Sequence, residues 1–80
     1  MELQRLRTVF RTALELPEDA EVESLEYRGI EQWDSLAHMS LVAAIEDEFD
    51  VMLETDEVID LSSFDRARQI LEKHGTVLTD

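Results

Sequence analysis

The stretch Trp33-Asp34-Ser35-Leu36, together with the apolar residues that follow it through Phe49, constrains this chain more than any other feature. Asp34 is suited to the N-cap of a helix, because its carboxylate can accept backbone N–H groups that the first turn leaves unpaired. Ser35 then falls in the first turn, with its hydroxyl near solvent. A helix N-terminus also attracts a phosphate, through its free N–H groups and its dipole. The sequence therefore predicts a helix whose first-turn serine could carry a phosphate-containing group at little cost to the fold.

The predicted helix is apolar on two sides. At about 100° per residue, one face collects an ordinary core stripe: His38, Leu41, Val42, Ile45 and Phe49. The opposite face carries Leu36, Met39 and Ala43, mixed with Ser40 and bordered by Glu46, Asp47 and Asp50. So short a chain has no obvious second core for this face to enter. We therefore predict that it docks partners with basic surfaces; a solvated acidic face is the alternative.

Length and charge narrow the classes of function. The 80 residues suffice for one small domain, which we expect to span 1–80, and no more. The net charge of −13 argues against nucleic acid or an anionic membrane surface as a partner, because binding either requires Lys and Arg to neutralise phosphates. No apolar run is long enough to span a bilayer, and the first residues lack the apolar segment of a signal peptide. We therefore expect a monomeric cytoplasmic protein.

The chain contains no cysteine. It therefore has no disulfide framework and no thiolate nucleophile of its own. Any thioester chemistry would need a sulfur atom from a prosthetic group.

Three further helices are predicted around the central one. Leu3, Leu6, Phe10 and Ala13 or Leu14 recur at helical spacing, which indicates a helix over 2–14 that Leu16-Pro17 ends. Thr55 is suited to cap a short helix over 56–59, with Val58 and Ile59 directed at the core. Ser62 or Ser63 starts the last helix, and Ser62 with Asp65 is close to a capping box. Its core stripe is Phe64, Ala67, Ile70 and Leu71, and Gly75 stops it before a frayed tail over 76–80.

A long connection over 18–32 separates the first two predicted helices. Val22, Leu25, Tyr27 and Ile30 are spaced through it, so we expect an ordered strap. Gly29 is predicted to supply a turn with positive φ. Trp33, at the end of the strap, is interpreted as a core anchor, with partner contact as the alternative. A loop of this length is uncommon in a compact domain unless it is functional.

The motif Asp34-Ser35-Leu36, followed by an apolar helix that ends Glu46-Asp47-Glu48-Phe49-Asp50, resembles the acyl carrier proteins, and the resemblance covers nearly the whole chain. It implies an all-α four-helix bundle with a long first loop and a short third helix that helps to gate the space for the acyl chain. It implies that Ser35 carries 4′-phosphopantetheine, with Asp34 helping to position the transferase or its metal. Fatty-acid carriers often have a small residue at the position of Trp33. A tryptophan there is more similar to the free-standing carriers of specialised pathways.

The resemblance also implies the activity and its partners. A phosphopantetheinyl transferase would attach the arm from coenzyme A, an acyl- or aminoacyl-loading ligase would charge its thiol, and downstream transferases or synthases with basic surfaces would take the cargo from the thioester. The chain itself would not be an enzyme. An aminoacyl or peptidyl carrier is a close alternative, and a non-covalent acidic helical interaction domain is a more distant one.

The residues do not support a catalytic serine site or a dedicated metal site. Ser35 with His38 as its base lacks a third group and a nucleophile elbow, and the two side chains point to different faces. His38 is therefore interpreted as a histidine at the edge of the core. The acidic cluster after Ile45 lacks the glycine that an EF-hand loop requires, so we predict no dedicated metal site.

Overall fold

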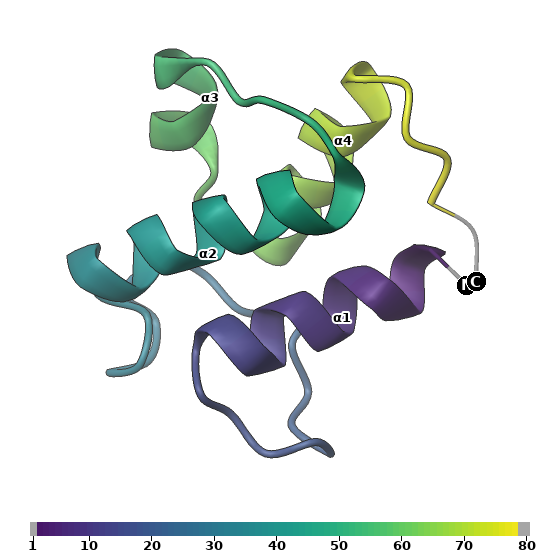
Figure 1. Cartoon of the computed structure of the whole chain (residues 1–80). Helices are drawn as coiled ribbons and strands as arrows, with labels where there is room; N and C mark the ends of the chain where they lie inside the picture. Colours follow the sequence, from purple (N-terminus) through teal and green to yellow (C-terminus); the bar gives the residue numbers. More distant parts are fainter. Residues whose placement is uncertain (1, 79–80) are drawn as a thin grey trace.

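The computed structural model describes residues 2–78 and contains four helices within that range: α1 (Glu2–Ala13), α2 (Ser35–Phe49), α3 (Thr55–Asp60) and α4 (Phe64–Lys73). α1 and α2 pack side by side, and α3 and α4 complete the bundle (Figure 1). No strand occurs over this range, and the β-type pairing there is an isolated antiparallel bridge between Glu26 and Ser63. The predicted all-α bundle, with its long first loop and short third helix, is confirmed. None of these helices is long and apolar enough to cross a membrane.

The core is a single cluster built mainly from α1, α2, α4 and the connecting segments, with Val58 of α3 packed against it. Trp33 is fully buried, and its ring meets Phe10 edge-on at 5.6 Å between centroids. Phe10 in turn meets Phe64 at 5.0 Å, so three aromatic rings join the strap, α1 and α4. The interpretation of Trp33 as a core anchor is therefore confirmed. The other fully or nearly fully buried apolar residues are Leu6, Val9, Leu14, Val22, Leu41, Val42, Ile45, Leu53, Leu61, Ala67, Ile70 and Leu71.

α1, α2 and α4 are each followed, within two residues, by a residue in the left-handed conformation: Glu15, Asp50 and Gly75. α1 ends at Ala13, one residue before the prediction, because Glu15 adopts φ 56° and the Leu16 N–H bonds the carbonyl of Arg11 at 2.8 Å. Gly75, with φ 92°, ends α4 as predicted, and the Thr76 N–H bonds the carbonyl of Leu71 at 3.0 Å. Of the predicted tail, residues 79–80 lie outside the described range.

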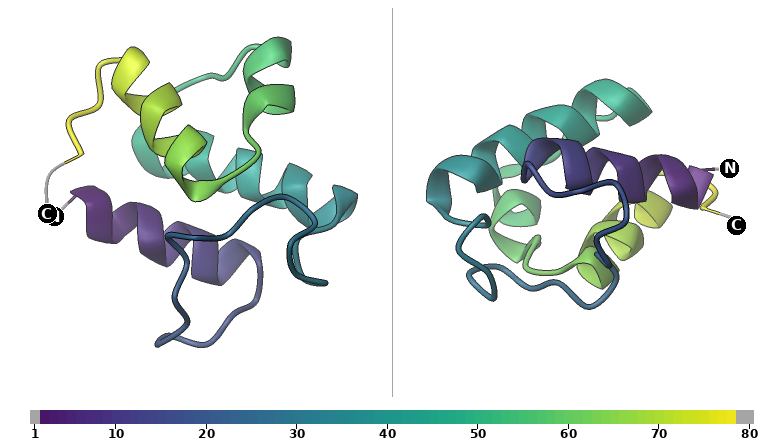
Figure 2. Two further views of the ribbon diagram at one scale, coloured as in Figure 1. Left: turned by 180° about the vertical axis from the view of Figure 1, so that it is seen from behind. Right: turned by 90° about the horizontal axis from the view of Figure 1, so that it is seen from below.

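The long connection is an ordered strap, as expected, and hydrogen bonds fix it to the start of α4. The Tyr27 N–H donates to the carbonyl of Ser62 at 2.8 Å, and the Phe64 N–H donates to the carbonyl of Leu25 at 3.3 Å. Figure 2 shows the strap passing beside the beginning of α4 before it reaches α2. These bonds place residues 25–27 beside the beginning of α4, and the Arg28 N–H bonds the carbonyl of Trp33 at 3.1 Å, directly before α2.

The prediction of a positive φ at Gly29 is wrong. Arg28, one residue earlier, takes the left-handed conformation, with φ 63°. Gly29 has a different reason to lack a side chain. Its N–H bonds the carbonyl of Glu26 at 2.8 Å, and a Cβ atom at Gly29 would lie only 3.0 Å from that oxygen.

α3 is one residue longer at each end than the predicted range 56–59, whereas α4 starts after Ser63, one of the two predicted serines. Glu54, not Thr55, is the N-cap of α3, because the side chain of Glu57 bonds the backbone N–H of Glu54 at 2.9 Å. Ile59 is 77% exposed, so its predicted direction toward the core is wrong, whereas Val58 is partly buried against the core. The N-cap of α4 is Ser63.

The predicted capping box of Ser62 with Asp65 is also absent. Ser63 Oγ accepts the N–H of Arg66 at 3.1 Å, which shifts the first turn of α4 by one residue. The backbone carbonyl of Ser62 is instead used to hold the strap through Tyr27.

Candidate functional site

Ser35 is the first residue of α2 and its side chain is exposed. Asp34 precedes it in an extended conformation and accepts the N–H of Ala37 on its carboxylate at 2.9 Å. The predicted N-cap is therefore confirmed. Since the cap bond is made by Asp34, the hydroxyl of Ser35 is not needed to complete the first turn, and it remains accessible for chemistry.

Two residues of the strap meet the hydroxyl of Ser35. The hydroxyl of Tyr27 lies 3.0 Å from Ser35 Oγ, and Arg28 Nη2 donates to the same oxygen at 3.2 Å. The hydrogen bond to Ser35 and, second, the guanidinium of Arg28 lower the pKa of the Tyr27 phenol. The sequence analysis did not include Tyr27 or Arg28 in the site, because only the folded path of the strap brings them to the start of α2.

The Ser35 hydroxyl sits at one edge of a shallow hollow between the strap and the start of α2. The residues that line the hollow are Arg28, Gly29, Ile30, Glu31, Trp33, Asp34, Ser35 and Leu36. The hollow opens to solvent beside an exposed serine, so a flexible group bonded to Ser35 Oγ can leave the surface without displacing any part of the core.

His38 is occupied on both ring nitrogens. Its Nδ1 accepts the indole N–H of Trp33 at 3.0 Å, so the proton lies on Nε2, which donates to the carbonyl of Val58 at 2.9 Å. The Trp33 and His38 rings are stacked with an interplanar angle of 20°. The interpretation of His38 as a satisfied histidine at the edge of the core is confirmed, and this arrangement leaves no nitrogen to act as a base on Ser35.

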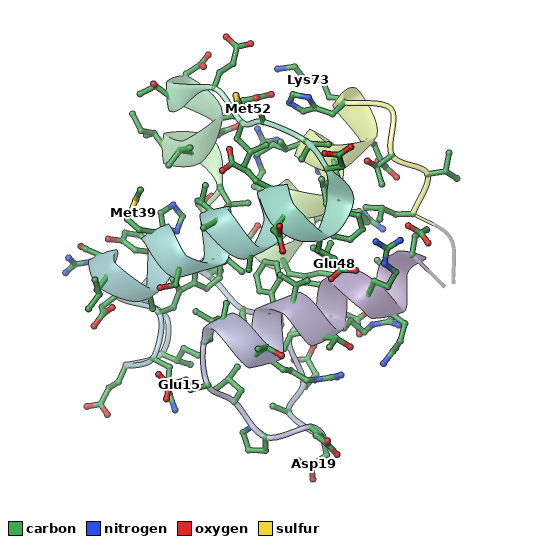
Figure 3. The ribbon with its side chains drawn as sticks, viewed as in Figure 1. Glu15, Asp19, Met39, Glu48, Met52 and Lys73 are labelled. Carbon is green, nitrogen blue, oxygen red and sulfur yellow. The ribbon has the colours of Figure 1, made fainter. Side chains whose placement is uncertain are left out.

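The second apolar face of α2 is exposed, as its helical spacing predicts. Leu36 is 80% exposed and Met39 57% exposed, and Ala43 is also exposed. Met52 and Ile59, which the sequence analysis did not assign to this face, are also exposed. Figure 3 shows Met39 and Met52 projecting outward on the side of the molecule where α3 lies. Exposed apolar side chains are therefore not confined to α2.

The acidic border of this face divides into two kinds of residue. Asp47 and Asp50 are exposed. Glu46 is half-buried, and its carboxylate accepts the N–H of Leu53 at 2.8 Å, so it holds the loop that follows α2. The sequence did not reveal this internal use of Glu46. The residues over 2–78 include no group of three or more His, Cys, Asp or Glu side chains arranged to hold a metal ion.

A buried carboxylate joins α3 to α4. Glu57 is 5% exposed and accepts hydrogen bonds from the Glu54 N–H and from His74 Nε2, each at 2.9 Å, while Lys73 Nζ lies 3.2 Å away. The backbone hydrogen bond of Glu54, followed by the His74 contact, lowers the pKa of Glu57 to about 2. The sequence analysis did not identify this role of Glu57, because its partners His74 and Lys73 come from the far end of α4.

Comparison with known proteins identifies the fold. No family model matches the chain, and no curated protein matches it. Among solved structures, a holo acyl carrier protein from Geobacter metallireducens, determined in solution by NMR, superposes with a TM-score of 0.67. The two sequences are 20% identical, and the match covers 98% of this chain and 95% of that one. The chain therefore has the fold of an acyl carrier protein.

Proposed function

We propose that this protein is an acyl carrier that bears 4′-phosphopantetheine on Ser35. The observation that carries the proposal is the position of Ser35: an exposed hydroxyl at the first residue of α2, directly after the Asp34 cap, in a chain with the acyl-carrier fold. The described residues suit the attachment, because Ser35 lies beside an open hollow and its hydroxyl has no structural bond to α2.

The attachment reaction needs little from this chain. Ser35 Oγ would attack the β-phosphorus of coenzyme A, forming a phosphodiester while the bond to adenosine 3′,5′-bisphosphate breaks and the serine proton passes to a base of the transferase. The bound arm supplies the thiol that the cysteine-free chain lacks. His38 takes no part, because both of its nitrogens are engaged. Asp34 caps α2 and presents a negative charge that helps to position the transferase or its metal.

The partner surface of the proposal is the exposed apolar face of α2. Leu36, Met39 and Ala43 would make apolar contact, and Asp47 and Asp50 would steer basic surfaces of the transferase, the loading ligase and downstream synthases. Such charges affect mainly the association rate and the choice of partner. Glu46, which we also predicted for this surface, would act indirectly by holding the loop after α2. The proposed setting is a monomeric carrier in the cytoplasm.

The test is to incubate the purified protein with coenzyme A, magnesium and a broad-specificity phosphopantetheinyl transferase, and to measure its intact mass. We expect one phosphopantetheine addition. Ser35→Ala should fold, because Asp34 retains the cap, yet accept no arm. Ser40→Ala is the matched control, since Ser40 is also an exposed serine of α2, and it should be modified normally. Arm attachment to Ser35→Ala would contradict the assignment. Failure of folded wild-type protein to accept an arm from two transferases would favour the non-covalent interaction domain.

A further inference from the structure

Arg28 occupies an unusual place in the charge pattern of the chain. It is the only lysine or arginine between Arg11 and Arg66, a segment rich in Asp and Glu. The other basic residues belong to α1 or α4. The single cation of this acidic segment nevertheless lies against Ser35, where Arg28 Nη2 donates to the serine oxygen at 3.2 Å. Its position is therefore not explained by a general basic surface.

The backbone and the neighbouring ring hold Arg28 in this place. Its φ of 63° is a conformation that glycine adopts easily and arginine rarely does. The backbone at Arg28 is therefore strained. The Arg28 N–H bonds the carbonyl of Trp33 at 3.1 Å, which closes the strap directly before α2. The guanidinium carbon lies 5.4 Å from the ring centre of Tyr27, a cation–π contact that orients it.

We propose that Arg28 and Tyr27 bind the phosphodiester at the base of the arm. This inference rests on the proposed function. Both side chains already meet at Ser35 Oγ, the atom to which the phosphorus would be bonded. A guanidinium and a phenol O–H are donors suited to phosphate oxygens. The phosphodiester would otherwise add a negative charge beside Asp34 in a chain whose net charge is already −13.

In the unmodified protein the two side chains only contact the serine hydroxyl, whereas in the modified protein they would hold the phosphodiester. With the base of the arm held by the strap, the arm leaves the surface from a defined point beside the hollow. Arg28 and Tyr27 are thus positioning residues: they orient the attached group and take no part in the chemistry at its thiol.

The test compares the arginine side-chain N–H signals of the protein with and without its arm by ¹H–¹⁵N NMR. Arg28→Gln, in its unmodified form, identifies the Arg28 signals by their absence. Arg68→Gln does the same for Arg68, which pairs with Asp65 on α4 and serves as the control. Intact mass first confirms that the arm is attached to the wild-type sample.

On arm attachment we expect the Arg28 signals to shift and their exchange with water to slow by about two- to fivefold, the range of an exposed ion pair. The Arg68 signals should stay unchanged. In Tyr27→Phe carrying the arm, the Arg28 shift should be smaller, because the ring no longer offers a hydroxyl to the same oxygens.

Unchanged Arg28 signals in protein that carries the arm would overturn this inference and leave the carrier function standing. Equal changes at Arg28 and Arg68 would also overturn it, because they would indicate a general effect of charge. Absence of any arm on Ser35 is a different result, visible in the mass spectrum, and it would contradict the proposed function itself.

Discussion

Replacing Asp34 separates its structural role from its proposed role in recognition. Asp34→Ala removes the oxygen that accepts the Ala37 N–H at 2.9 Å. Loss of such an N-cap costs about 1 kcal/mol. At about 2.1 cal/mol/K of unfolding entropy per residue, an 80-residue domain has about 0.17 kcal/mol/K, so the melting temperature should fall by about 6 °C.

Asp34→Asn is the matched control for that variant. Its side-chain oxygen keeps the cap, since Asn and Asp are about equally good N-caps, but the negative charge is lost. Both variants relieve the same amount of self-repulsion in this acidic chain. The difference between them therefore isolates the cap, and we expect Asp34→Asn to melt within about 2 °C of the wild type.

The assay is thermal unfolding followed by circular dichroism at one fixed salt concentration, with phosphopantetheine transfer measured on the same samples. If the charge of Asp34 positions the transferase or its metal, both variants should be modified slowly although only one is destabilised. Equal melting temperatures for the Ala and Asn variants would refute the capping argument. Wild-type transfer rates in both would refute the role in recognition.

Three further predictions concern other parts of the molecule. The pKa of Glu57 falls from 4.5 to about 2 in the folded protein, so its contribution to stability is present above pH 4.5 and is lost as the pH falls toward 2. Glu57→Gln should therefore have a lower free energy of unfolding near neutral pH, and this free energy should fall less steeply on acidification than that of the wild type. Urea unfolding at several pH values measures both, and the same pH dependence in the two proteins would contradict this. Met39→Glu should raise the KM for the transferase by about 5- to 30-fold, the effect of losing about 1–2 kcal/mol at an interface, with unchanged helicity by circular dichroism; loss of helicity would mean that Met39 supports the core. Trp33→Ala should lower the free energy of unfolding by about 3–5 kcal/mol, out of the roughly 4–12 kcal/mol expected for a domain of this size. Trp33→Phe should lower it less. Equal urea midpoints for Trp33→Ala and the wild type would contradict the account of the core.

The features predicted correctly from the sequence are those that depend on near neighbours. The Asp34 cap and the Gly75 stop each involve residues within one or two turns, so the residue types and their spacing were sufficient. Trp33 was predicted to be buried because a large aromatic residue at the end of an apolar-spaced strap has few other places to go. The exposed face with Leu36 and Met39 followed from the period of α2.

The features that were missed depend on contacts between distant segments. Arg28 reaches Ser35 because the strap is fixed both to the start of α4, through Tyr27, and to the carbonyl of Trp33. Glu57 is buried because His74 and Lys73 arrive from the far end of α4. Ile59 points outward in a helix of six residues, which is too short for its apolar period to define a face. The expectation that the short third helix helps to gate the space for the acyl chain stays untested.

The most direct measurement of the central claim is the location of the added group. After treatment with coenzyme A and transferase, cleavage after glutamate should yield the segment 32–46, which contains Ser35 and Ser40. Fragmentation of this peptide by tandem mass spectrometry distinguishes the two serines. Our account predicts a 4′-phosphopantetheinyl group on Ser35 alone. A group on Ser40, or an unmodified peptide from folded protein, would contradict it.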